Sequence, residues 1–125
     1  MRTETEPDTA LGRELARSEW SGYLTEFERR LDPGEELETT LELVGPEEPI
    51  GTEAERLPLD SVTFEHGDDQ IAISLGGRGH RYPVVLRHFV DQPRRMWVHE
   101  DDGRPIAITI ESEDGTRTLL TLYAQ

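Results

Sequence analysis

Apolar and polar residues alternate without a break in Ile106-Ala107-Ile108-Thr109-Ile110-Glu111-Ser112. An alternation with a period of two is typical of an antiparallel strand that has one buried and one exposed face. Turn sequences flank this stretch, with Asp101-Asp102-Gly103 before it and Glu113-Asp114-Gly115 after it. Asp-Gly pairs favour tight hairpin turns, because both residues tolerate a positive φ. The end of the chain therefore predicts a β-hairpin made of residues 106–112 and 117–123.

The same succession of strands and turns runs back through the chain to residue 37. One face of the first expected strand is formed by Leu37, Thr39, Leu41 and Leu43. We expect further strands at residues 50–59, 62–66, 70–75, 82–86 and 94–100. The stretch 50–59 is an expected edge strand, because Pro58 has no N–H to donate to a neighbouring strand. The pattern predicts a curved, mostly antiparallel sheet of about seven strands.

One amphipathic helix precedes these strands. Apolar residues recur at spacings of four, three and four, at Trp20, Leu24, Phe27 and Leu31, which is the stripe of a helix with one buried face. Ser18 stands where an N-cap belongs, and Glu19 follows in the first turn, where an acid complements the helix dipole. The spacing predicts a helix over Ser18–Leu31 that packs on the sheet, and therefore an α+β fold.

The chain of 125 residues is long enough for one domain with a core of its own. We expect residues 1–11 to form a disordered tail and residues 12–125 to form a single α+β domain. Cysteine is absent, which excludes disulfides and thiolate chemistry. The sequence has no signal-peptide pattern and no apolar run of roughly 18 residues. We therefore expect a cytoplasmic protein with no membrane partner.

The charge of the chain is strongly acidic. The formal net charge is −14, and residues 1–60 carry 17 acids against 6 arginines. All 13 basic residues are arginine. Nucleic acid is not an expected partner, because binding phosphates needs clustered positive charge. The acidity leaves three explanations open: solubility, adaptation to high salt, or mimicry of nucleic acid towards a basic partner.

The residues that carry most protein chemistry do not form a recognisable motif. The histidines are separated by 14, 8 and 11 residues, at His66, His80, His88 and His99, so none forms a closely spaced ligand pair. The acids after His99 are explained by a strand that runs into a hairpin turn. The loop Gly76-Gly77-Arg78-Gly79-His80 precedes a strand rather than a helix, which leaves at most a weak anion contact. We expect no catalytic residue, no metal and no cofactor.

Arg94, Arg95 and Trp97 are the best candidates for a binding surface. Alternation places Arg95 and Trp97 on one face of their strand and Arg94 on the other. Trp and Arg are frequent anchors of protein interfaces, so an outward pair would suit a partner. The more ordinary interpretation is that Trp97 completes the core under the helix, with Arg95 at its rim. Together with His88, these three residues form the candidate partner-binding set.

Three stretches of the chain resemble one known family. They are Arg17-Ser18-Glu19-Trp20-Ser21-Gly22-Tyr23-Leu24, then Leu57-Pro58-Leu59-Asp60-Ser61-Val62, then His88-Phe89-Val90-Asp91-Gln92-Pro93-Arg94-Arg95-Met96 followed by Asp102-Gly103 and Asp114-Gly115. Over about residues 12–124 the chain resembles domain-of-unknown-function family 5335. The resemblance implies a small single-domain bacterial protein of similar α+β build. It brings no activity and no catalytic residues to carry over.

Three hypotheses for function follow from these observations. The leading one is a non-enzymatic cytoplasmic domain that binds another protein or a second copy of itself, because the chain has exposed strand edges and no catalytic motif. The second is a small-ligand or metal-assisted enzyme with a site near His88, His99 and Arg94. The third is an acidic mimic of nucleic acid, whose binding to a basic partner would collapse as salt rises.

Overall fold

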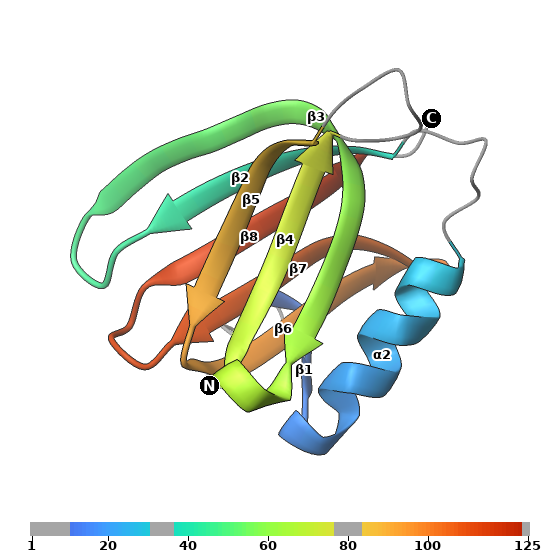
Figure 1. Ribbon diagram of the computed structural model, residues 1–125, viewed down its shortest axis with the longest axis horizontal. Coiled ribbons are helices and arrows are strands. Elements are labelled where there is room, and N and C mark those ends of the chain that lie inside the picture. The colour runs from blue at the N-terminus through green and yellow to red at the C-terminus, as the bar shows by residue number, and fades with distance from the viewer. Residues whose placement is uncertain (1–10, 31–36, 77–83, 124–125) are drawn as a thin grey trace, which may run out of the picture.

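The computed structural model describes residues 11–30, 37–76 and 84–123 (Figure 1). In chain order its elements are β1 (Arg13–Leu15), α2 (Arg17–Arg29), β2 (Glu38–Val44), β3 (Pro49–Glu65), the 3₁₀ turn η1 (His66–Asp68), β4 (Gln70–Gly76), β5 (Val84–Asp91), β6 (Pro93–Asp101), β7 (Arg104–Ser112) and β8 (Arg117–Tyr123). Three predicted features lie wholly or partly outside the described residues: residues 1–10 of the expected tail 1–11, the predicted last helical residue Leu31, and residues 77–80 of the glycine-rich loop.

The strands form one sheet in the order β1-β6-β7-β8-β2-β3-β4-β5. Every neighbouring pair is antiparallel. The hairpin predicted at the end of the chain is β7 paired with β8. The described sheet has eight strands rather than about seven, and one of them is the short β1, which pairs with β6 through Arg13–Leu15. The predicted curved antiparallel sheet with an N-terminal helix is otherwise confirmed.

Strand β3 is one continuous strand of 17 residues, where the sequence predicted two. Its first part, from Pro49 to Pro58, pairs with β2, and its second part, from Leu59 to Glu65, pairs with β4. Pro58 misled the prediction, because it marks the change of pairing partner rather than the end of the strand. Arg56 has a positive φ of 57°, and the register with β2 shifts several times. β3 therefore bends and carries β4 and β5 across the face of β7 and β8 (Figure 1).

The core lies between the two halves of this bent sheet. The half built from β2, β6, β7 and β8 contributes Leu41, Met96, Val98, Ile108, Ile110 and Leu120, and the half built from β3 and β4 contributes Leu59, Val62, Ile71, Ile73 and Leu75. All of these side chains are buried. Ile71, Ile73 and Leu75 of β4, which alternate in the predicted strand 70–75, all lie on this inward face.

Helix α2 begins at Arg17, one residue before the predicted start, and its N-cap is Ala16 rather than Ser18. The Glu19 side chain accepts a hydrogen bond from the Ala16 N–H at 2.8 Å, and the Glu19 N–H donates to the Ala16 carbonyl oxygen at 2.8 Å. Half of a capping box is therefore present without a capping hydroxyl. Ser18 lies inside the first turn, because the helix begins one residue earlier, at Arg17.

The helix closes the gap between β3 and β6. Its buried stripe is Trp20, Leu24 and Phe27, as predicted. Trp20 packs edge-to-face on Phe64 of β3 with ring centroids 5.3 Å apart. Glu28 accepts a hydrogen bond from the Val62 N–H at 3.0 Å, on the part of β3 that no longer pairs with β2. Among the described residues, no helix has the length and apolar composition that a membrane span requires.

Candidate functional site

The predicted Arg/Trp pair lies on the outer face of the sheet, where β6 is flanked by β1 and β7. Trp97 stands opposite Glu14 of β1 and Thr109 of β7. Its neighbours Met96 and Val98 belong to the core on the opposite face. The next row across the strands places Arg95 opposite Glu111, and Glu111 opposite Arg117. Two cations with an acid between them therefore border the tryptophan ring.

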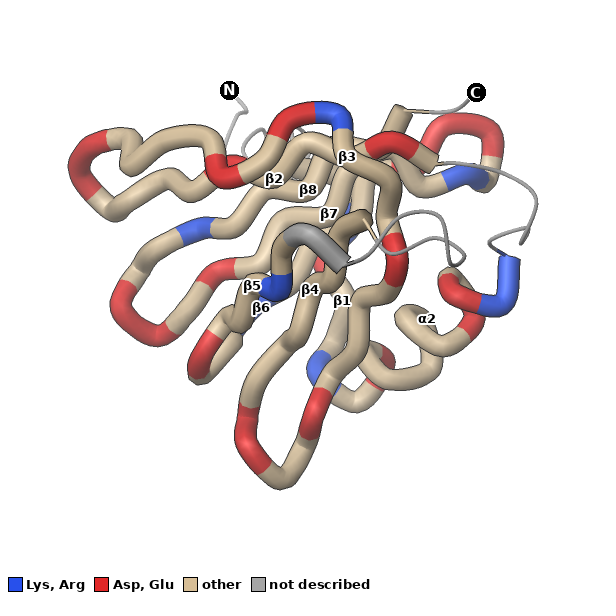
Figure 2. The backbone as a smooth tube through the Cα atoms, turned by 45° about the horizontal axis from the view of Figure 1, so that its top comes forward, with Lys and Arg blue, Asp and Glu red and all other residues tan. Residues whose placement is uncertain are grey.

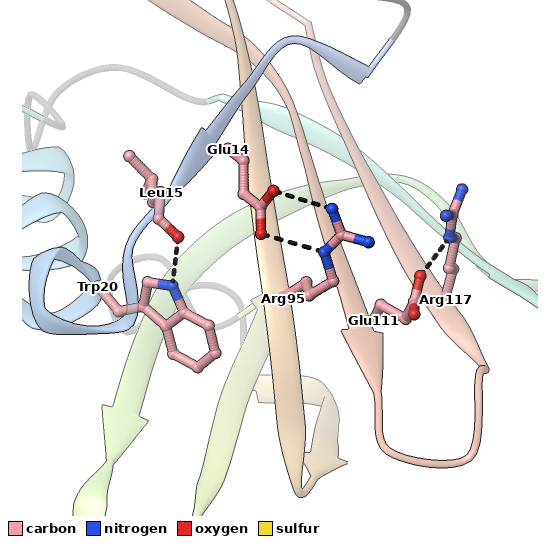
Figure 3. Close-up of polar contacts among 6 residues, drawn as sticks. All are labelled: Glu14, Leu15, Trp20, Arg95, Glu111 and Arg117. Atoms are coloured by element: carbon pink, nitrogen blue, oxygen red, sulfur yellow. Dashed lines mark hydrogen bonds and ion pairs between the residues drawn. The ribbon is translucent and has the colours of Figure 1, made fainter. Parts of the chain in front are cut away.

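Both arginines lie over the Trp97 ring. The guanidinium carbon of Arg95 is 4.7 Å from the ring centroid, and that of Arg117 is 5.1 Å from it. Arg95 binds both carboxylate oxygens of Glu14, at 2.9 and 3.1 Å, and Arg117 pairs with Glu111 at 2.9 Å (Figure 3). The hydrogen bond from Arg95 lowers the pKa of Glu14 below its ordinary value. This set of five residues, here called the Trp97 cluster, is held together by charge-assisted contacts.

The Trp97 cluster leaves little of its aromatic ring in contact with solvent. Trp97 is 1% exposed, which agrees with the ordinary interpretation that the ring is buried. It is buried on the outer face rather than under the helix, however, and its indole N–H has no hydrogen-bond partner among the described residues. Whether Arg95 and Trp97 contact a partner stays a prediction.

Arg94 and His88 lie near a second feature, an open pocket of about 250 Å³. The pocket lies between the end of β5 and the turn that joins β7 to β8, and it is lined by residues 88–92 and 112–114 together with Leu43, Thr116 and Thr118. Arg94 sits where the pairing of β6 with β7 shifts by one residue. It does not line the pocket, but it binds Glu113 of the pocket rim at 3.0 Å.

His88 faces the inner side of the sheet and is half-buried. It stands opposite Ile73 of β4, which is a core residue. Burial lowers the pKa of His88 below its ordinary value, while Glu53 and Asp91 act in the opposite direction. The imidazole is therefore neutral at pH 7, so it presents one N–H donor and one nitrogen acceptor to the pocket.

The carboxylates around the pocket already have partners within the protein. Asp91 accepts a hydrogen bond from Gln70 at 2.6 Å. Asp114 accepts one from the Thr116 N–H at 2.9 Å, and this bond lowers the pKa of Asp114. Among the described residues, no three His, Asp or Glu side chains are close enough to hold a metal ion. The pocket is thus lined by a neutral imidazole and by acids that already have hydrogen-bond partners within the protein.

His99 is not part of this pocket. It lies near the far end of β6, next to Glu100, which accepts a hydrogen bond from the hydroxyl of Tyr23 in α2 at 2.8 Å. Burial and this hydrogen bond raise the pKa of Tyr23. The structure therefore does not bring His88, His99 and Arg94 together around this pocket, as the enzyme hypothesis requires.

Sequence reasoning missed a third feature, the free edge of β5. β5 is the last strand of the described sheet, and it pairs only with β4. Phe89 projects from its outer face and is 45% exposed, with the guanidinium of Arg87 5.8 Å from its ring centroid. The sequence prediction ended a strand at Leu86 and so left Phe89 outside it. The alternation of Leu86, His88 and Val90 with outward neighbours is the signal that could have extended the strand.

Comparison with known proteins gives the chain its family. Residues 11–125 match the family of unknown function DUF5335. The chain belongs to this family. The resemblance noted in the sequence is thereby confirmed, and it covers every described element of the fold.

A relative of this DUF5335 protein occurs in Aquifex aeolicus (strain VF5). It is named only as an uncharacterized protein, and it is 24% identical over 108 residues, which cover 86% of this chain and 88% of the relative. No solved structure matches the chain with significance. The family brings no activity with it, so the functional argument has to come from the geometry of the DUF5335 fold itself.

Proposed function

We propose that this DUF5335 protein is a non-enzymatic cytoplasmic domain that binds a protein chain along the free edge of β5. The observation that carries the proposal is the position of β5 at the end of the sheet, with Phe89 45% exposed beside an open pocket. The backbone N–H and C=O groups along such an edge are available for pairing with an added strand.

The composition of β5 favours strand addition. Its eight residues, Val84–Asp91, include no proline and no glycine, and most of them are apolar or β-branched. Proteins usually protect an edge strand with proline, a bulge or inward-pointing charge. The charged residues of β5, Arg87 and Asp91, point to the same outer side as Phe89. The pairing of β5 with β4 shifts between Leu86 and Val84 and is regular from Leu86 to Asp91. A partner strand would therefore meet a regular edge along this stretch, with Phe89 as an aromatic anchor.

Two of the predicted partner-binding residues adjoin this edge. His88 faces the pocket from β5, and Arg94 orients Glu113 at the pocket rim. In the proposed complex the pocket lies beside the added strand, with the neutral His88 in its wall. Arg95 and Trp97 belong to the Trp97 cluster, where their charges and ring surface are already engaged, and we assign them a role in stability.

Charge supports a protein partner rather than nucleic acid or a membrane surface. The chain carries a net charge of −14, and acids occupy most of its turns (Figure 2). Anionic phosphates or lipid headgroups would be repelled by this distribution.

A photoreactive phenylalanine analogue tests the proposal in the cell that naturally makes the protein. Placed at Phe89, it should give a covalent adduct with one defined polypeptide after irradiation. The matched control is the same analogue at Ile50, which is 57% exposed but lies at the start of β3. Equal cross-linking at both positions, or none at Phe89, would overturn the proposal.

A further inference from the structure

We infer that the chain bound at the β5 edge is a second copy of this protein, paired antiparallel about a twofold axis at Phe89. The inference rests on the proposed function, since it requires β5 to be a binding edge. It adds the identity of the partner and the register of the two strands.

The pairing of β5 with β4 fixes which residues share the outer face. Val90 stands opposite Ile71, and His88 opposite Ile73, over the core. Their neighbours Arg87, Phe89 and Asp91 therefore lie in a row on the other face. This row contains one cation, one ring and one anion at even spacing, and no other strand flanks it on the free side in the described sheet.

A twofold axis turns this row into a self-complementary surface. In a symmetric antiparallel pair, the same patch is used by both copies, and opposed residues lie on the same face. With the axis at Phe89, the two phenylalanine rings face each other. Arg87 then stands opposite the partner's Asp91, and the reverse pair forms by symmetry. One register thus places an aromatic pair between two opposite-charge pairs, each of which stabilises a sheet.

Neighbouring registers lack this complementarity. An axis at Arg87 places the two Arg87 side chains opposite each other, which destabilises the pair. An axis at Val90 places each Phe89 opposite the partner's Asp91 and leaves Arg87 without an acid. The charge pattern of β5 therefore favours the register centred on Phe89.

Charge reversal tests the register. Arg87→Asp places Asp opposite the partner's Asp91 in both pairs, and Asp91→Arg places Arg opposite Arg87 in both pairs. Each variant alone should weaken dimerisation, measured by sedimentation equilibrium, by about tenfold or more. An equimolar mixture of the two variants should recover it, because each copy then opposes acid to arginine twice. The inference fails if the mixture is no better than the single variants, or if either variant dimerises like the wild type.

Cysteine cross-linking gives a second readout that does not depend on charge. The chain has no cysteine of its own, so Phe89→Cys introduces one thiol opposite its symmetry mate. Oxidation of the purified protein should give a disulfide-linked dimer at Phe89→Cys, and far less at Ile50→Cys, which is more exposed. Cross-linking at equal rates would indicate random collision and overturn the inference.

Failure of this inference can be told apart from failure of the proposed function. If Phe89 is cross-linked in cells to a different protein while the purified chain stays monomeric, the β5 edge is a binding site and the second copy is excluded. If the cellular adduct is this chain itself, both proposals stand. If no adduct forms at Phe89, both fall.

Discussion

Two of the places where an arginine lies next to an aromatic ring on the outer surface of this sheet, at Trp97 and at Phe89, are built differently. Trp97 lies on β6, which has a paired strand on each side, and two ion-paired arginines cover its ring. Phe89 lies on β5, which has a paired strand on one side, and one arginine reaches its ring. The exposed fractions are 1% for Trp97 and 45% for Phe89.

Position in the sheet decides what an Arg/aromatic pair does. Inside the sheet, acids on neighbouring strands pair with the arginines and hold them over the Trp97 ring, which stabilises the fold. At the edge, half of these neighbours are missing, so the ring and the backbone remain available for contact. The two regions make different predictions for stability and for association, and each can be tested separately.

The largest difference is expected when each ring is truncated. Trp97→Ala should lower the free energy of unfolding by about 3 kcal/mol, because it empties a fully buried site. Phe89→Ala should change it by about 0.5 kcal/mol or less at low protein concentration, where association does not contribute. Urea denaturation measures both values. Similar losses for the two variants would contradict the division between a structural cluster and a binding edge.

A smaller difference is expected when each arginine is removed. Arg95→Ala loses two hydrogen bonds to Glu14 and a contact with the Trp97 ring. Both partners are partly exposed to solvent, so the loss should be about 1 kcal/mol. Arg87→Ala on β5 should leave the free energy of unfolding nearly unchanged. If Arg87→Ala were the more destabilising of the two, the β5 row would have a structural role.

The pH dependence of stability separates the regions further. The pKa of His88 is lowered in the folded state, so the unfolded chain takes up its proton first as the pH falls. Stability should therefore decrease from the ordinary histidine value of about 6.5 down to the lower folded value. His88→Gln should remove this decrease in urea midpoints measured between about pH 7.5 and 5.

The Trp97 cluster should respond only at lower pH. The pKa of Glu14 is lowered, so its contribution is present above the ordinary glutamate value and is lost as the pH falls through the folded value. Glu14→Gln should abolish that part of the acid sensitivity while leaving the His88 part intact. A loss of both parts together would mean that the two regions are coupled.

The smallest effect concerns salt and association at the edge. Two copies with a net charge of −14 each repel one another, and the range of this repulsion falls from about 30 Å at 0.01 M salt to about 8 Å at 0.15 M. Dimerisation through β5 should therefore strengthen over this range, as measured by sedimentation. Binding to a basic partner by an acidic mimic of nucleic acid would weaken instead, so the sign distinguishes the two hypotheses.

Local periodicity was enough to predict most of the elements. The helix stripe of Trp20, Leu24 and Phe27 and the final hairpin follow from spacing alone, because each uses contacts between residues close in sequence. The N-cap was predicted wrongly: Ser18 has the side chain that is usual at this position, but the helix begins at Arg17 with Ala16 as its N-cap, and the Ala16 N–H is bound by the Glu19 carboxylate. The continuity of β3 was missed because proline usually ends pairing, whereas Pro58 lies where one partner replaces another.

The candidate surfaces depend on strand order, which local sequence does not specify. The pattern around residues 94–97 correctly placed Arg95 and Trp97 on one face, but it could not show that Glu14, Glu111 and Arg117 come from three other strands to surround them. The free edge of β5 was missed for the same reason. Alternation indicates which residues face inward, and only the long-range pairings indicate which strand is last.

The unbroken strand β3 also affects how the molecule unfolds. Because one segment from Pro49 to Glu65 supplies hydrogen bonds first to β2 and then to β4, neither layer can open fully without disturbing the other. Unfolding should therefore be cooperative across both halves of the bent sheet. The amide protons of Leu41 and Ile73 should exchange with solvent through the same global opening. The bend in β3 that brings the two layers face to face thus also couples their unfolding.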